Sequence, residues 1–114
     1  MPLRILCLLL LAMPAYATSA YLSAAPDIPL APGLVETRNV VFDKPQGRIV
    51  RIDASHAADD AHTILAFYRA ALPNLGWAVI ERKDGVAVFR RGDEILRVTM
   101  TASRVVFDIA PARR

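Results

Sequence analysis

Runs of apolar residues with different periods divide the chain after residue 38 into strands and one helix. Residues 39–43 (NVVFD) and 48–53 (RIVRID) are rich in β-branched side chains and flank Lys44-Pro45-Gln46-Gly47. Proline at the second position and glycine at the fourth are typical of a tight turn. These two runs therefore predict a β-hairpin.

Residues 57–72 change to a helical period. Their apolar side chains fall on one arc of an α-helix: Ala57, Ala61, Ile64, Leu65, Tyr68, Ala71 and Leu72. Pro73 and Gly76 then provide a stop signal, since proline disfavours helix in the residue before it. The pattern predicts one amphipathic helix.

Four short strands with tight turns are expected after Gly76, at residues 77–82, 86–91, 94–101 and 104–109. Pairing outward from the turns at 84–85, 92–93 and 102–103 places the apolar side chains on one face, and a shift by one residue at any turn would destroy this agreement. The predicted apolar pairs are Ile80–Phe89, Phe89–Leu96, Ala87–Val98, Val98–Phe107, Leu96–Ile109 and Met100–Val105, and the opposite-charge pairs are Arg91–Glu94 and Arg97–Asp108.

The predicted fold class is α+β: a β-hairpin, one helix and then a four-stranded antiparallel meander, with the helix packed on one face of the sheet. Residues 39–111 are expected to form a single domain, preceded by an extended, Pro-rich lead-in at residues 21–38. The core should join sheet residues to helix residues, namely Phe89, Leu96, Val98 and Phe107 to Ile64, Leu65, Tyr68 and Leu72.

Residues 1–20 have the pattern of a secretory signal peptide. Arg4 supplies a positive charge, residues 5–13 (ILCLLLLAM) are continuously apolar, and small residues follow. This order predicts export, with cleavage after Ala17 or alternatively after Ala20. Because no charge occurs between Arg4 and Asp27, an uncleaved anchor in the inner membrane is the alternative. Both interpretations place the domain outside the cytoplasm, periplasmic or secreted.

The composition narrows the chemistry of the mature domain. Cys7 is the only cysteine and lies in the apolar N-terminal stretch, so the domain can form no disulfide and no thiolate metal site. The formal net charge is +3, and the arginines are interleaved with acidic residues instead of forming one basic stripe. We therefore expect no nucleic-acid partner.

Catalytic and cofactor motifs are absent from the sequence. His56, Asp59 and His62 lack the four-residue histidine spacing of helical zinc sites, and no Gly-rich phosphate loop occurs, so we predict no metal and no cofactor. The leading hypothesis is a non-enzymatic accessory or binding domain of the cell envelope. A small envelope enzyme with a site around His62 is the alternative, although His62 has no evident nucleophile or acid–base partner.

Trp77, Arg90 and Arg97 are the candidate binding residues. The predicted register puts Trp77 on the face opposite the core, beside these arginines. An exposed aromatic ring flanked by arginines suits an envelope protein or an anionic surface, including a membrane surface if Arg82 is exposed with them. A bulge after Gly76, or cover by the lead-in, would instead bury Trp77.

Three motifs carry a resemblance across most of the mature chain. They are residues 42–49 (FDKPQGRI), residues 67–77 with the pattern F-Y-x-x-x-L-P-x-L-G-W, and residues 89–96 with F-x-R-x-x-E-x-L. In these the chain resembles an uncharacterised family of small exported envelope proteins of proteobacteria. The resemblance implies an envelope location and a similar fold, but no activity and no assigned site.

Overall fold

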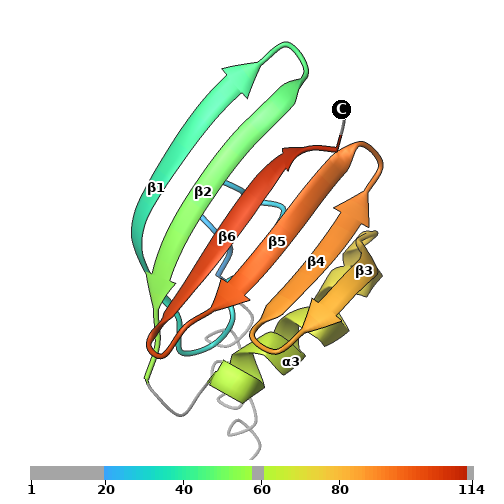
Figure 1. Ribbon diagram of the computed structural model, residues 1–114. Helices are drawn as coiled ribbons and strands as arrows, with labels where there is room; N and C mark the ends of the chain where they lie inside the picture. The colour runs from blue at the N-terminus through green and yellow to red at the C-terminus, as the bar shows by residue number, and fades with distance from the viewer. Residues whose placement is uncertain (1–19, 58–60, 113–114) are drawn as a thin grey trace, which may run out of the picture.

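The computed structural model describes residues 20–57 and 61–112, so most of the predicted signal peptide, and Asp59, lie outside the described residues. Six antiparallel strands form one sheet in the order β1-β2-β6-β5-β4-β3, with one helical segment between β2 and β3 (Figure 1). The elements are β1 (Val35–Lys44), β2 (Gly47–Ser55), α3 (Ala61–Ala71), the 3₁₀ helix η3 (Leu72–Leu75), β3 (Ala78–Lys83), β4 (Val86–Arg91), β5 (Glu94–Met100) and β6 (Arg104–Pro111).

The predicted fold, a four-stranded meander with the helix packed on one face, is wrong. The β1–β2 hairpin belongs to the same sheet as the meander, because β2 pairs with β6 and sets Ile52 opposite Phe107. This pairing buries the apolar side of β2, which an isolated hairpin would leave in water. The helical segment is also short for such a sheet: α3 has 11 residues and η3 has four.

Within the meander, the predicted pairs that involve β4, β5 and β6 are confirmed, including Phe89–Leu96, Val98–Phe107 and the two opposite-charge pairs. The predicted pairing of Ile80 with Phe89 is wrong. The register of β3 against β4 shifts between Val79 and Glu81, and Val79 lies opposite Phe89. Ile80 is therefore an extra residue at a β-bulge, and the side chains before it exchange faces.

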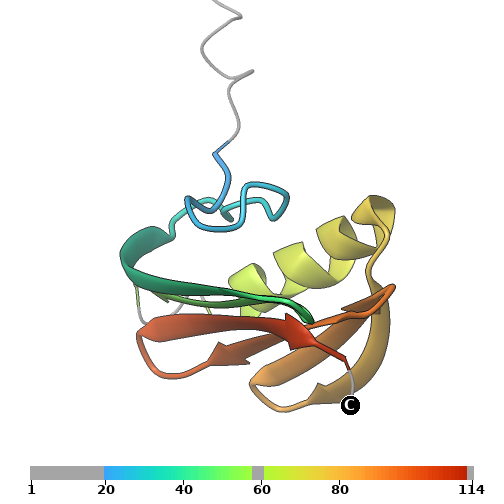
Figure 2. The ribbon, with the colours of Figure 1, turned by 90° about the horizontal axis from the view of Figure 1, so that it is seen from above.

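Residues 20–34, which we call the N-terminal arm, cover the part of the sheet that the helix leaves open. Figure 2 shows the arm and α3 on the same side of the sheet. The arm is irregular, as its prolines predict, but it is not a detached lead-in. Every third side chain enters the core: Leu22, Ala25, Ile28, Ala31 and Leu34.

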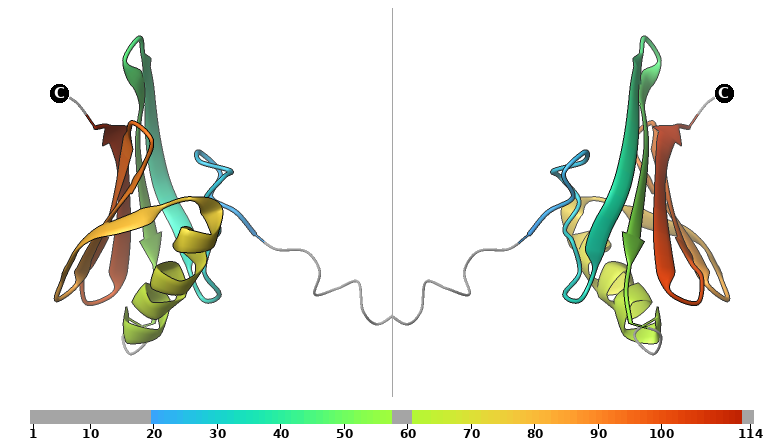
Figure 3. Two further views of the ribbon diagram at one scale, coloured as in Figure 1. Left: turned by 90° about the vertical axis from the view of Figure 1, so that its right-hand side faces the viewer. Right: turned by 90° about the vertical axis from the view of Figure 1, so that its left-hand side faces the viewer.

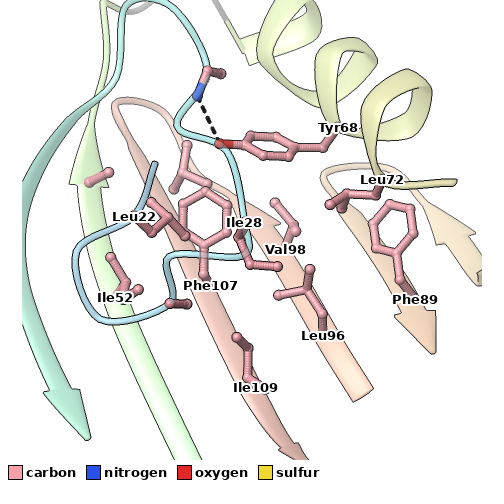
Figure 4. Close-up of a cluster of buried hydrophobic side chains, with 14 of the residues drawn as sticks. Leu22, Ile28, Ile52, Tyr68, Leu72, Phe89, Leu96, Val98, Phe107 and Ile109 are labelled. Carbon is pink, nitrogen blue, oxygen red and sulfur yellow. Dashed lines mark hydrogen bonds between the residues drawn. The ribbon is translucent and has the colours of Figure 1, made fainter. Parts of the chain in front are cut away.

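The eight predicted core residues are buried, and Tyr68 connects the three layers. Its ring packs edge-on against Phe107, with 5.2 Å between ring centroids. Its hydroxyl donates a hydrogen bond to the Pro29 carbonyl (2.7 Å) and accepts one from the Ala31 N–H (2.9 Å). Figure 4 shows the Tyr68 ring pointing from α3 toward the sheet, with a dashed line at its hydroxyl. Burial raises the pKa of Tyr68, so this phenol stays protonated and keeps both bonds.

Candidate functional site

One face of the sheet carries no described helix, strand or arm (Figure 3). We call it the open face. Cross-strand partners point to the same side of a sheet, so the pairing registers define its members. From β1 to β4 these are Arg38, Val40, Phe42, Lys44, Ile49, Arg51, Asp53, Ser55, Arg104, Val106, Asp108, Ala110, Ile95, Arg97, Thr99, Val86, Val88 and Arg90.

The structure separates the three candidate binding residues. Arg90 and Arg97 are exposed on the open face, as predicted. Trp77 lies on the covered face and is only 1% exposed, because the bulge at Ile80 reverses the orientation of the residues before it. The exposed aromatic-and-arginine patch that the register predicted is therefore not formed.

Trp77 contacts a different arginine. The guanidinium carbon of Arg91 lies 4.3 Å from the centroid of the indole ring, a cation–π geometry that also screens the ring from water. Gly76 permits this approach: its φ is +93°, and a Cβ there would lie 3.3 Å from Cδ of Arg91. Trp77 is thus a core residue under a charged cap.

The Arg91 guanidinium that covers Trp77 belongs to an ion network, and this network connects the N-terminal arm to the sheet. Arg48 on β2 donates from Nε to Glu94 (2.7 Å) and from both terminal nitrogens to Asp27 of the arm (2.9 and 3.1 Å). Arg91 donates a further bond to Asp27 (2.5 Å). Partial burial by itself raises the pKa of Asp27, but the hydrogen bonds from Arg48 and Arg91 lower it more, to about 2. Each charged side chain of this network has an oppositely charged partner within the network, so we assign the network a structural role.

This network predicts an acid-dependent stability. Because the pKa of Asp27 falls from 3.8 to about 2 on folding, its carboxylate stabilises the fold above about pH 4, and that stabilisation is lost as the pH falls from about 4 to 2. Asp27→Asn should lower the free energy of unfolding at pH 7 by on the order of 1–2 kcal/mol and flatten the decline in that window. Urea titrations at several pH values measure both effects. Asp84→Asn, at the exposed turn between β3 and β4, is the matched control, and an unchanged acid profile in Asp27→Asn would contradict the assignment.

The open face holds a cluster of loosely paired charges where β1, β2 and β6 meet. Arg38, Arg51 and Arg104 surround Asp53 at a depression of about 330 Å³ that Val40 also lines. Nε of Arg38 and Nε of Arg51 each lie 3.8 Å from an Asp53 oxygen, which is too long for a hydrogen bond. Oδ1 of Asp53 is buried and has no hydrogen-bond partner in the described part of the chain.

We call these four residues the arginine cluster. Oδ1 of Asp108 on β6 also lies 3.7 Å from Nη1 of Arg51, so the three guanidinium groups meet two carboxylates. The Arg38 and Arg51 side chains are 70% and 60% exposed. A guanidinium presents paired donors that match the oxygens of phosphate or carboxylate, and an unpartnered buried acceptor favours a ligand that brings a donor. The cluster is therefore suited to an anionic group with a hydroxyl or ammonium beside it.

The surroundings of His62 do not favour the enzyme alternative. His62 is exposed on α3 and lines, with Arg69 and Asp84, a depression of about 170 Å³, smaller than the roughly 300–1,000 Å³ of typical ligand sites. His56 is buried, and its Nδ1 lies 2.5 Å from the Ala57 carbonyl oxygen, a contact within the local backbone. Across residues 20–57 and 61–112, no three metal-ligating side chains gather at one place.

Comparisons with protein-family models, curated proteins and solved structures found no match to this chain. In the described ranges, no helix combines the length and apolar character needed to cross a membrane.

Proposed function

We propose that this chain is an exported, non-enzymatic binding domain of the cell envelope, whose open face binds a phosphate-bearing surface. The arginine cluster carries the proposal: three guanidinium groups from three strands converge beside a buried carboxylate oxygen that lacks a partner. The signal-peptide pattern at residues 1–20 and the resemblance to exported envelope proteins support a periplasmic location, in which anionic headgroups are available.

The ligand chemistry follows from the two kinds of group in the cluster. The guanidinium groups of Arg38, Arg51 and Arg104 are expected to bind phosphate oxygens. Oδ1 of Asp53 is expected to accept a hydrogen bond from a hydroxyl on the neighbouring carbon atoms of the same ligand. A glycerophosphate headgroup has both, so vesicles containing phosphatidylglycerol are the appropriate probe.

Co-sedimentation with phosphatidylcholine vesicles, with and without phosphatidylglycerol, tests the proposal. The wild-type chain should sediment only with the anionic vesicles, and Arg51→Glu should weaken binding by about tenfold or more, since each basic residue near an anionic surface contributes ~1 kcal/mol. Arg82→Glu is the matched control, because Arg82 is equally charged and exposed on β3 but lies outside the open face. Binding that ignores phosphatidylglycerol, or equal losses in the two variants, would refute the proposal.

Asp53→Ala separates a specific headgroup site from general attraction. If Oδ1 accepts a headgroup hydroxyl, removing this acceptor should weaken binding although the net charge becomes more positive, whereas asparagine would still offer an acceptor oxygen. If the face acts only through its charge, the same variant should bind more tightly. Competition by soluble glycerol phosphate then distinguishes recognition of the headgroup from recognition of a lipid surface.

A further inference from the structure

Strand β1 presents an unprotected edge. It has ten residues, and no described strand pairs with its outer side. Phe42 and Val41 are 54% and 45% exposed, and Figure 1 shows the tip of the β1–β2 hairpin extending beyond the end of β6. Val40, Val41 and Phe42 form an apolar run within this edge. An exposed edge with such a run is a template for pairing with another strand.

The opposite edge of the sheet, β3, has the features that prevent such pairing. It is six residues long, contains the bulge at Ile80, and ends in Glu81-Arg82-Lys83. In β1 the register shift is confined to residues 36–38, and residues 38–44 pair with β2 without interruption. β1 carries charges too, at Glu36, Arg38, Asp43 and Lys44. Its bulge and these charges flank residues 40–42, so this central run is the part of the edge that is available for a partner strand.

We propose that β1 pairs antiparallel with β1 of a second copy of this chain, so that the two sheets form one across a two-fold axis. With such an axis, the open faces of the two copies lie on the same side of the joined sheet. Residues that are directly opposite across the axis must therefore both belong to the open face or both to the covered face. Centring the axis on Val40 sets Val40 against its own copy and Arg38 against Phe42, both on the open face. Centring it on Val41 would set Arg38 against Lys44 instead.

The charges on β1 select between these registers. Two cations directly opposite each other are destabilising, which disfavours the register centred on Val41. In the register centred on Val40, each Arg38 lies over a Phe42 ring, an attractive cation–π arrangement that forms twice. One strand pair is smaller than a standard interface of roughly 1,600 Å², so we expect a reversible, concentration-dependent dimer.

A single-cysteine variant tests the register directly. The only native cysteine, Cys7, is absent from a chain that starts at residue 18, so Val40→Cys is the only thiol in that chain. Directly opposite residues in an antiparallel pair have Cα atoms ~4.5–5.5 Å apart, within the range of disulfides. Oxidation should convert most of the Val40→Cys protein to a covalent dimer. Ile80→Cys on the other edge is the control; it is 53% exposed and should cross-link far less.

A second variant tests the same pairing without disulfide chemistry. Val40→Lys places two like charges on the two-fold axis and should give a monomer by light scattering, with unchanged circular dichroism. The proposal is overturned by a wild-type chain that stays monomeric at all concentrations, or by cross-linking of Ile80→Cys that equals that of Val40→Cys. Arg38 and Val40 also belong to the proposed phosphate site, so the oligomeric state is measured without vesicles. A chain that dimerises but does not bind vesicles would refute the proposed function alone, and a monomer that binds them would refute this inference alone.

Discussion

A chain that begins at Val35 should not fold cooperatively, whereas one that begins at residue 18 should unfold in a single transition. The shorter chain lacks Leu22 and Ile28, which are fully buried and worth ~1.5–3 kcal/mol each. It also loses the bonds of Asp27 to Arg48 and Arg91, and it leaves the Tyr68 hydroxyl without its two partners. These losses together approach a domain's total stability of about 5–15 kcal/mol.

Thermal unfolding followed by circular dichroism compares the two chains. Two neighbouring substitutions provide a finer test. Leu22→Ala should lower the free energy of unfolding by about 2–5 kcal/mol, while Tyr21→Ala, at a half-exposed position, should change it by a few tenths. A chain beginning at Val35 that unfolds as cooperatively as the longer one would show that the arm is not part of the domain.

The arm also distinguishes the two expected cleavage sites. The Ala20 carbonyl accepts a hydrogen bond from the Leu30 N–H (2.9 Å), and Tyr21 forms a β-bridge with Pro29. Cleavage after Ala17 preserves this hydrogen bond, whereas cleavage after Ala20 removes its acceptor. If the chain is cleaved, we therefore expect N-terminal sequencing of the exported protein to begin at Thr18.

The pairing of β4, β5 and β6 could be predicted because its register is set locally. The short turns at 92–93 and 102–103 join strands that are neighbours in sequence, and the apolar alternation agrees with each turn. The pairing of β2 with β6 has no such signal. In the sequence, Ile52 and Phe107 are separated by the helix and strands β3 to β5. No local turn pairs them, and the burial of their apolar faces brings the two strands together.

The arm did contain a signal, but of an unfamiliar period. Its buried residues recur at every third position from Leu22 to Leu34, a spacing that fits neither the 3.6-residue helix nor the two-residue strand. The prolines between them indicate an irregular segment, which is correct, and irregular segments are usually assumed to be solvent-exposed. This spacing could have been interpreted as burial only if the uncovered part of the sheet face had already been known.

The arginine cluster could not be predicted for the same topological reason. Arg38, Arg51 and Arg104 lie on three strands that meet only through the β2–β6 pairing. Arg90 and Arg97 could be placed on the open face because the local β4–β5 register determines their orientation. A bulge, in contrast, leaves no clear mark in the sequence, and the one at Ile80 changed the position of Trp77.

Trp77→Ala should lower the free energy of unfolding by about 3–5 kcal/mol, the range for removing a core aromatic. The indole is 1% exposed, and its loss leaves a cavity under Arg91. Trp77→Phe should lose less, because a phenyl ring still fills part of the site and still faces the guanidinium. Ile80→Ala, at the exposed bulge, should cost a few tenths and serves as the control for β3.

Urea denaturation and fluorescence quenching measure the two consequences of this burial. In the native chain, the emission of Trp77 should resist acrylamide, and unfolding should remove that protection. Each Trp77 variant should also retain its affinity for anionic vesicles as long as it remains folded, since the indole and the open face lie on opposite sides of the sheet. A folded Trp77→Ala protein of native stability that no longer binds vesicles would reverse this assignment and return Trp77 to the binding surface.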